Sequence, residues 1–188
     1  KPVLQGKIEA WGEIGLAVKA NEYMDNTSNI FGVRVIRLSV DSVELFQSDL
    51  NRFAFSETRY LNAWVDYEEW QTNRAFYMRS YIEPGNRLRF MEAEDRGIIT
   101  IDEERPYQVT YTLADLAGNT THFSFRIIGK RQAIPQPDLT GREHFRWNSD
   151  NRFGAKGIRL VIPKGNLYAD IDFLYRAKTD SNAQVLLH

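Results

Sequence analysis

Residues 104–128, ERPYQVTYTLADLAGNTTHFSFRII, decide how the chain folds. Apolar side chains occupy every second position on both sides of a polar stretch: Tyr107, Val109, Tyr111 and Leu113 before it, and Phe123, Phe125 and Ile127 after it. This period of two is typical of a half-buried β-strand. The polar stretch, residues 115–119, supplies turn-forming residues, and its Gly118 and Asn119 adopt positive φ angles at little cost. The sequence therefore predicts a long antiparallel β-hairpin.

The composition is that of an ordinary globular protein, with 43% hydrophobic and 26% charged residues in a chain of 188. Because the net charge is −1, charge gives no indication of a nucleic-acid partner or an anionic membrane surface. The chain has no cysteine, which excludes disulfide bonds and thiolate metal sites. No apolar run reaches the ~20 residues of a membrane-spanning helix. The chain begins with Lys1-Pro2 rather than a start methionine or a signal peptide, so we expect a fragment or a processed product.

The β pattern recurs in shorter pieces over the first 130 residues. Further strands are expected at residues 6–20 (two strands that meet near Gly12), 33–40, 43–47, 53–55, 76–82, 88–91 and 97–101. Ser56–Asn73 interrupts this pattern, because Tyr60, Trp64 and Tyr67 recur there at spacings of four and three. We expect one or two helical turns inserted between the strands, with these three rings on one face.

The composition changes at Gly129–Asp138, GKRQAIPQPD, where two prolines indicate a linker. Beyond it, Gly157–Ile162 and Leu167–Arg176 flank Pro163–Asn166, which predicts another hairpin. An isolated hairpin is only marginally stable in water. We therefore divide the chain into a β-sandwich at residues 1–130 and a second part at residues 131–188, whose hairpin packs on the sandwich or begins a second β domain.

A zinc site needs three or four His, Cys, Asp or Glu ligands that converge on one point. The chain has only three histidines, and none belongs to an H-x-H or H-E-x-x-H motif: His122, His144 and His188. His122 alternates with Phe123 in the predicted hairpin, so we expect it on the polar face. The sequence predicts no catalytic or metal-ligating residue in this region.

A second metal hypothesis concerns the polar loop before residue 33. Asp25, Thr27 and Asn29 carry oxygen-bearing side chains at alternate positions, as calcium-binding loops do. The glycine and the terminal glutamate of an EF-hand loop are absent. A turn stabilised by side-chain hydrogen bonds is the preferred interpretation, and a structural calcium ion near Asp25 is the alternative.

Residues 64–70, WVDYEEW, combine three aromatic rings with three carboxylates. Glycoside hydrolysis needs two carboxylates ~5–9 Å apart in a cleft, whereas neighbours on one helix edge usually form a solvated surface, so we expect no catalysis from Asp66, Glu68 and Glu69. Trp64, Tyr67 and Trp70 are the candidates for a glycan or partner contact. The alternative is core packing, which we favour for Trp64, while Trp70 stays undecided.

Several stretches together resemble a known family. The pattern Y-x-V-x-Y-x-L-x-D-x-x-G-N at Tyr107–Asn119 resembles the last two strands of bacterial immunoglobulin-like sandwiches. Seven further runs resemble the region downstream of the catalytic domain in large envelope proteins of the lysostaphin-type zinc metallopeptidase family: Ile8–Ala20, Tyr23–Val33, Arg52–Tyr60, Asp66–Trp70 (DYEEW), Glu83–Phe90 (EPGNRLRF), Ile101–Tyr107 and Ile162–Tyr168. In that family the catalytic domain binds zinc through a His, an Asp and an H-x-H pair, and it cuts peptide bridges in peptidoglycan. None of these motifs occurs here, so no catalytic residue is carried over.

The resemblance implies an all-β, immunoglobulin-like sandwich with a short helical insertion, followed by part of a second β unit. It also implies a non-catalytic accessory module that positions or restrains a zinc peptidase domain in the periplasm or cell envelope. The expected partners are the upstream peptidase domain and, beside it, peptidoglycan or another envelope protein, without nucleic acid or a membrane span. Any zinc belongs to the parent's catalytic domain. The alternative is a glycan-binding or adhesin-like module that uses Trp64 and Trp70; a free-standing enzyme is disfavoured because no catalytic constellation is present.

Overall fold

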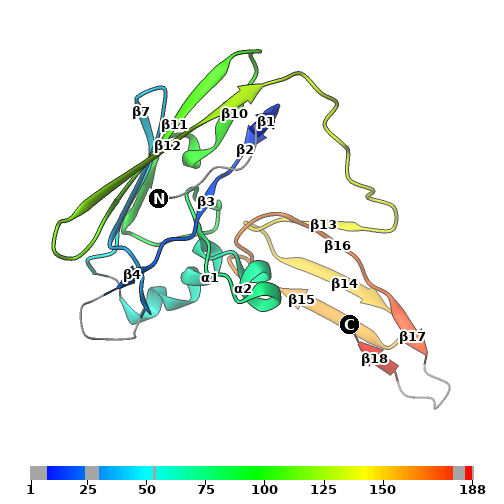
Figure 1. Ribbon diagram of the computed structural model, residues 1–188. Coiled ribbons are helices and arrows are strands. Elements are labelled where there is room, and N and C mark those ends of the chain that lie inside the picture. The colour runs from blue at the N-terminus through cyan, green and yellow to red at the C-terminus, as the bar shows by residue number, and fades with distance from the viewer. Residues whose placement is uncertain (1–7, 24–29, 53, 180–184, 188) are drawn as a thin grey trace. The chain divides into compact units, whose positions relative to one another are not determined.

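The computed structural model describes residues 8–23, 30–52, 54–179 and 185–187 (Figure 1). Strands hold 42% of the residues and helices 13%, which confirms the predicted all-β class. The chain forms two compact units, unit 1 at residues 1–134 and unit 2 at residues 135–188. The boundary lies after Ile134, whose side chain approaches Gly12 so closely that a β-carbon there would meet it. Among the described residues, no helix has the length and apolar character to cross a membrane.

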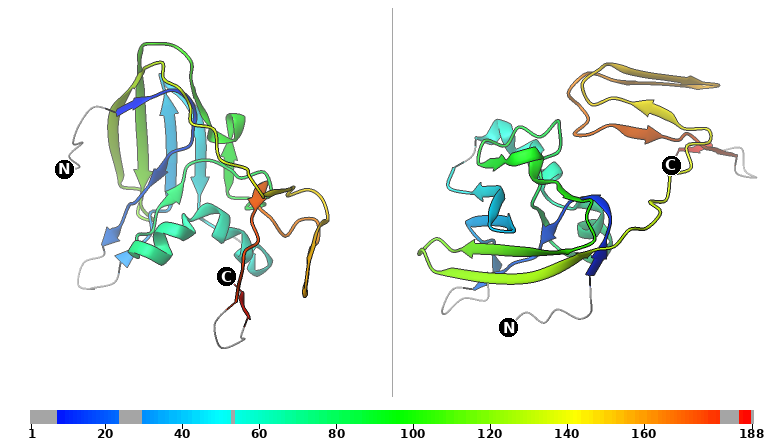
Figure 2. Two further views of the ribbon diagram at one scale, coloured as in Figure 1. Left: turned by 90° about the vertical axis from the view of Figure 1, so that its right-hand side faces the viewer. Right: turned by 90° about the horizontal axis from the view of Figure 1, so that it is seen from above.

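Unit 1 is built on a six-stranded sheet with the order β1-β12-β11-β6-β7-β9 (Figures 1 and 2). Its strands are β1 (Ile8–Ala10), β6 (Val35–Val40), β7 (Val43–Asp49), β9 (Met91–Ala93), β11 (Pro106–Ala114) and β12 (Thr120–Gly129). Only the β1–β12 pair is parallel in this sheet. Three short pairs accompany it: β2 (Gly12–Ile14) with β10 (Ile99–Ile101), β3 (Ala17–Val18) with β8 (Met78–Arg79), and β4 (Glu22–Tyr23) with β5 (Ile30–Phe31).

The strand order is that of an immunoglobulin-like sandwich. The order β12-β11-β6-β7 corresponds to strands G, F, C and C′ of a variable-type domain, and the β2–β10 pair corresponds to strands B and E of the opposite sheet. The core lies between these layers, where side chains from β6, β7, β10, β11 and β12 meet: Ile36, Leu38, Phe46, Ile99, Ile101, Val109 and Ile127, each at most 2% exposed.

The predicted hairpin is confirmed. β11 and β12 pair antiparallel from Pro106 opposite Ile128 to Ala114 opposite Thr120. In the turn, Gly118 has a φ of +90°, and Asp115 Oδ1 accepts a hydrogen bond of 2.8 Å from the Asn119 main-chain N–H. The hairpin contributes its alternate apolar residues to the core, as the period of two indicates.

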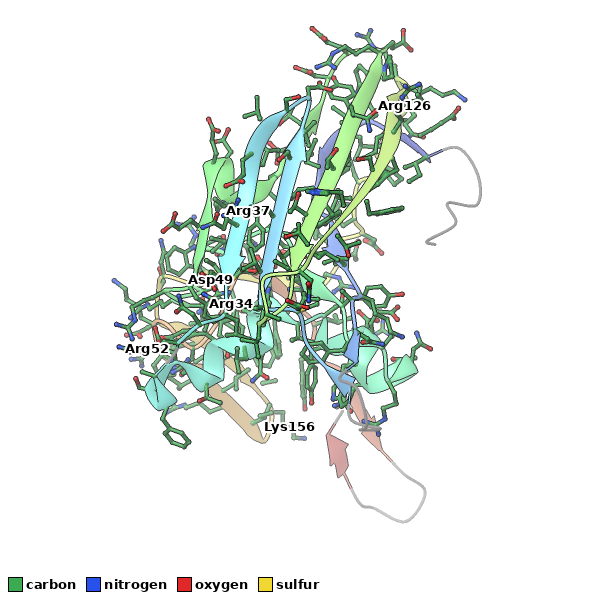
Figure 3. All side chains as sticks on the ribbon, turned by 60° about the vertical axis from the view of Figure 1, so that its left-hand side comes forward. Arg34, Arg37, Asp49, Arg52, Arg126 and Lys156 are labelled. Atoms are coloured by element: carbon green, nitrogen blue, oxygen red, sulfur yellow. The ribbon has the colours of Figure 1, made fainter. Side chains whose placement is uncertain are left out.

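The opposite face of the six-stranded sheet is polar. Its cross-strand neighbours include Thr110 and Ser124, whose hydroxyls lie 2.9 Å apart. Arg37 lies on β6 on the same face, and beside it Arg34 Nε donates to Asp49 Oδ1 at 2.9 Å (Figure 3). The alternation of apolar and polar residues therefore gives the sheet one core face and one polar face.

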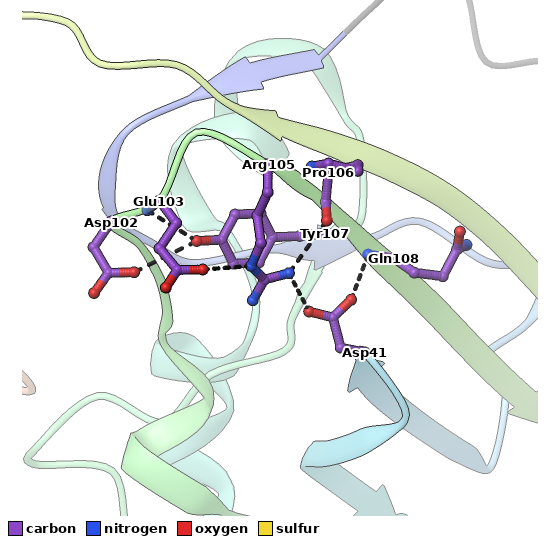
Figure 4. A network of polar contacts seen from close by, with 7 residues as sticks. All are labelled: Asp41, Asp102, Glu103, Arg105, Pro106, Tyr107 and Gln108. Carbon is purple, nitrogen blue, oxygen red and sulfur yellow. Dashed lines mark hydrogen bonds and ion pairs between the residues drawn. The ribbon is translucent and has the colours of Figure 1, made fainter.

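A network of polar contacts around Asp41 and Arg105, which we call the polar clamp, lies at one end of unit 1 (Figure 4). Asp41, in the tight β6–β7 turn, accepts hydrogen bonds from the Gln108 main-chain N–H at 2.9 Å and from Arg105 Nη1 at 2.7 Å. These bonds, the first of them foremost, hold the pKa of Asp41 below its ordinary value. The Arg105 guanidinium also bonds Glu103 at 2.7 Å and lies 3.8 Å from the centre of the Tyr107 ring. The clamp thus ties the β6–β7 turn to the segment between β10 and β11.

Several of the predicted short strands are wrong in whole or in part. Phe55 is the first residue of a 3-10 helix rather than a strand residue, while Phe53 lies outside the described residues. Of residues 76–82, only Met78 and Arg79 form a strand, and of residues 88–91 only Met91 does. Around Met91, two further backbone features shorten the strand: a turn at residues 89–90 before it and the 3-10 helix η2 (Glu94–Gly97) after it.

Unit 2 is a small β unit, and its described residues form six short strands. They are β13 (Glu143–Phe145), β14 (Asn151–Ala155), β15 (Ile158–Ile162), β16 (Ile171–Phe173), β17 (Ala177–Thr179) and β18 (Val185–Leu187). They pair antiparallel as β13–β16, β14–β15 and β17–β18. Its aromatic core has Phe145, 3% exposed, stacked on Phe173 with ring centres 4.9 Å apart, and Phe153 edge-on to Phe173 at 5.2 Å.

The predicted hairpin around Pro163–Asn166 is wrong. β15 turns back on β14 through Gly157, which has a φ of +81°, and β16 pairs with β13 instead of β15. Residues 163–166 instead bond to the segment before β14. The Lys164 N–H donates to Asp150 at 2.8 Å, and the Gly165 N–H donates to the Trp147 carbonyl at 3.2 Å.

Candidate functional site

The helical insertion of unit 1 begins at a buried carboxylate. Glu57 lies in the 3-10 helix η1 (Phe55–Tyr60), and its side chain is only 10% exposed. Its carboxylate accepts hydrogen bonds from Arg89 at 2.6 and 3.1 Å and from the Ala54 main-chain N–H at 2.6 Å. These contacts, those of Arg89 first, lower the pKa of Glu57 to about 2. An ion pair to a residue 32 positions away therefore fixes where the insertion starts.

The insertion then changes direction between two short helices. α1 (Leu61–Trp64) ends at Val65, which is extended and forms a β-bridge with Met78. Asp66 starts α2 (Tyr67–Asn73), because its Oδ1 accepts a hydrogen bond of 3.2 Å from the Glu69 main-chain N–H. The predicted single face for Tyr60, Trp64 and Tyr67 is wrong for this reason: Trp64 is 4% exposed at the end of one helix, whereas Tyr67 is 55% exposed at the start of the next.

The two helices border an apolar cleft of about 450 Å³, which we call the aromatic cleft. Its lining comes from α1, α2, the segment that leads to β8, and the loops before β6 and after β7: Gly32, Val33, Leu50, Leu61, Asn62, Trp64, Val65, Tyr67, Trp70, Phe76 and Met78. The cleft thus brings together Trp64, Tyr67 and Trp70, the three rings singled out from the sequence. Trp70 and Phe76 are 37% and 43% exposed, so the rim of the cleft is open to solvent.

Few polar groups line the aromatic cleft. Side-chain polarity comes from the Asn62, Tyr67 and Trp70 side chains. Trp64 Nε1 is buried and finds no hydrogen-bond partner among the described residues, and the Trp64 ring meets Phe90 edge-on at 5.3 Å. The Trp70 ring is flanked by Phe76, edge-on at 6.1 Å, and by the Arg74 guanidinium 5.7 Å from its centre. Such a cleft suits an apolar side chain.

The three carboxylates near these rings have other roles. Asp66 caps α2 and lies 4.0 Å from Arg79, and Glu69 accepts a hydrogen bond of 2.8 Å from Asn73. Glu68 is exposed, and none of the three lines the cleft. They follow the surface of one helix rather than facing each other across the cleft, as paired catalytic carboxylates would.

The metal candidates are dispersed. Within the described part of the chain, no three His, Asp or Glu side chains are grouped as ligands of one ion would be. His122 Nδ1 lies 3.0 Å from the Thr112 hydroxyl on the polar sheet face, and His144 lies in unit 2. His188 and the calcium candidates Asp25, Thr27 and Asn29 lie outside the described residues.

Sequence reasoning missed Phe76 as part of the cleft. The strand expected at residues 76–82 does not begin at Phe76. Phe76 instead packs against Trp70, just after Arg74, which has a left-handed backbone conformation with a φ of +52°. The signal was the two-residue spacing of Phe76 and Met78, which places both side chains on one side of an extended segment.

Comparison with known proteins concerns unit 2. Residues 142–188 are similar to the Zu5-like domain, whose family model matches them. This match covers β13 to β18 and does not include the aromatic cleft. Neither the curated proteins nor the solved structures gave a significant match.

Proposed function

We propose that the chain is a non-catalytic accessory module of a bacterial cell-wall zinc endopeptidase, located in the periplasm or cell envelope. Its role is to position or restrain the peptidase domain. The proposal rests on the resemblance of runs such as Ile8–Ala20, Asp66–Trp70 and Glu83–Phe90 to the region downstream of the catalytic domain in lysostaphin-type metallopeptidases. The observation that carries the contact role is the aromatic cleft, a partly exposed apolar surface on the helical insertion.

The chemistry of the cleft favours a protein partner over a glycan. Each sugar hydroxyl that loses water needs a new hydrogen-bond partner, and the lining offers few. Trp64 is buried, and Trp70 is flanked by Phe76 and Arg74, so the two indoles do not form an open stacking platform. An apolar side chain makes no such demand, and half-exposed aromatic residues are enriched at protein interfaces.

The alternative function is a glycan-binding or adhesin-like module. One observation favours it: Tyr67 and Trp70 lie on the same helix three residues apart and are 55% and 37% exposed. Residues three apart on a helix are neighbours on its surface. In this case peptidoglycan itself, rather than the peptidase domain, is the ligand.

The test is binding of the chain to the peptidase domain that this proposal places upstream of it. Calorimetry measures the affinity, and release of peptides from peptidoglycan measures the activity with and without the chain. Tyr67→Ala with Trp70→Ala should weaken binding roughly tenfold or more, because central aromatic contacts commonly contribute about 2 kcal/mol. Phe55→Ala is the matched control, since Phe55 is 94% exposed and does not line the cleft.

Three outcomes would contradict the proposal. Equal affinity of the cleft variant and the Phe55→Ala control would remove the cleft from the interface. Binding of peptidoglycan fragments that requires Tyr67 and Trp70, without binding to the peptidase domain, would support the glycan alternative. Release of peptides by the isolated chain would overturn the non-catalytic role.

A further inference from the structure

In unit 2, the half-exposed side chain of His144 lies between two carboxylates. β13 and β16 pair so that His144 lies opposite Asp172, and Asp170 precedes Asp172 by two residues. His144 Nδ1 is 3.0 Å from Asp172 Oδ1, and His144 Nε2 is 3.3 Å from Asp170 Oδ2. Both ring nitrogens therefore face an acceptor at hydrogen-bonding distance.

This geometry favours one protonation state. An ionised carboxylate only accepts hydrogen bonds, so each of the two contacts needs an N–H on the imidazole ring. A neutral imidazole has one N–H, and its other nitrogen presents a lone pair to a carboxylate oxygen. The imidazolium satisfies both contacts. In agreement, the pKa of His144 is raised above its ordinary value, chiefly by the Asp172 hydrogen bond, with Asp170 adding to it.

The cluster of His144, Asp170 and Asp172 joins the short strands β13 and β16. The β13–β16 ladder has three residue pairs, from Glu143 opposite Phe173 to Phe145 opposite Ile171. Asp170 also accepts a hydrogen bond of 2.9 Å from the Trp147 main-chain N–H, so it connects the segment after β13 to the segment before β16.

The two charged residues that precede His144 in the sequence, Arg142 and Glu143, are directed elsewhere. Arg142, just before β13, donates to the main-chain oxygen of Asp172 at 3.1 Å and to that of Asp138 at 3.0 Å. Glu143 adjoins His144 in β13, and strand alternation directs its side chain to the opposite face. Among the residues that the structure describes, the charged groups that face the imidazole are thus Asp170 and Asp172.

We propose that His144 is a pH-operated latch of unit 2, which fastens β16 to β13 as an imidazolium and releases one carboxylate when it loses its proton to solvent. A group whose pKa is higher in the folded state stabilises that state fully below its unfolded pKa. The contribution is lost as the pH rises through the folded-state pKa. The β13–β16 pair is therefore tighter in mildly acidic than in alkaline solution. This inference is independent of the aromatic cleft.

The test uses nuclear magnetic resonance of the full chain. The His144 ring signals give its pKa, and amide exchange gives the protection of the β13–β16 amides and of the Trp147 N–H. Protection, corrected for intrinsic exchange, should fall as the pH passes the measured pKa of His144. His144→Gln should abolish this pH dependence, and His144→Arg, which stays charged, should keep protection level at all pH values. His122→Gln is the control in unit 1 and should leave the profile unchanged.

A pKa of His144 at or below the ordinary value would overturn the latch. So would a wild-type protection profile that matches that of His144→Gln. If the His144 variants do not fold, Asp170→Asn and Asp172→Asn provide the test, because each should lower the measured pKa of His144. An unchanged His144 pKa in both would overturn the proposal as well.

Discussion

Replacing Trp64 by alanine tests how unit 1 uses its helical insertion. The Trp64 ring is 4% exposed, packs edge-on against Phe90 at 5.3 Å, and belongs to the same buried cluster as Met78. Deleting a buried aromatic side chain costs ~3–5 kcal/mol. The ring pair with Phe90 contributes about 0.5–1.5 kcal/mol of that. We therefore expect Trp64→Ala to lower the free energy of unfolding of unit 1 by ~3–5 kcal/mol.

The unpartnered indole N–H makes a second substitution informative. A buried donor without a partner costs about 1–3 kcal/mol, and Trp64→Phe removes this donor. Its loss of stability should therefore be markedly smaller than that of Trp64→Ala. Urea denaturation of the full chain gives the free energies, and amide exchange of β11 assigns the transition to unit 1. Trp70→Ala is the control, with an expected loss of about 1–2 kcal/mol for a partly buried ring. Equal losses for Trp64→Ala and Trp70→Ala would refute the reasoning.

Three further predictions concern other parts of the chain. Gly118→Val should destabilise unit 1 by about 1–2 kcal/mol, because φ is +90° there while no neighbouring atom obstructs a side chain. The control Gly154→Val lies in a strand with equally open space and no positive φ, so it should cost far less stability. Equal costs of the two substitutions would show that the backbone conformation of the turn is not the cause. Glu57 has its pKa lowered from 4.5 to about 2, so its stabilising contribution is complete above pH 4.5 and lost as the pH falls towards 2. Glu57→Gln should flatten this part of the acid-unfolding profile, and a profile that keeps the wild-type slope would contradict the assignment. Purified chain should hold no stoichiometric zinc by elemental analysis, and one tightly bound zinc per chain would contradict the non-catalytic proposal.

The fold was predictable from the sequence where local signals agreed. In the β11–β12 hairpin, the period of two, the buried rings and Gly118 all indicate the same structure. At Phe55 a local apolar pattern suggested a strand, but the ion pair of Glu57 with the distant Arg89 favours a helix. In unit 2, Gly157 and Gly165 were both able to form the turn of a hairpin, and sequence spacing does not distinguish them.

The sequence predicted which aromatic residues belong to the candidate site, but not how they are arranged in it. Trp64, Tyr67 and Trp70 do line one cleft, although helical spacing placed Trp64 and Tyr67 on a continuous face. The β-bridge between Val65 and Met78 separates the two helices. No local sequence pattern predicts a contact between residues 13 positions apart. The cluster of His144, Asp170 and Asp172 was missed because the two carboxylates come 26 and 28 positions later, one just before β16 and one within it.

The parallel pairing of β1 with β12 gives unit 1 a mechanical property. Three residue pairs, the Lys130–Glu9 ion pair of 2.7 Å and the hydrogen bond from the Lys130 N–H to the Ala10 carbonyl join these strands where the linker leaves. Because the strands run in the same direction, tension between the start of β1 and the end of β12 pulls along both strands in opposite senses. It therefore loads these bonds together, in shear, instead of opening them one after another. Unit 1 can transmit a pulling force to the linker while its sheet stays closed.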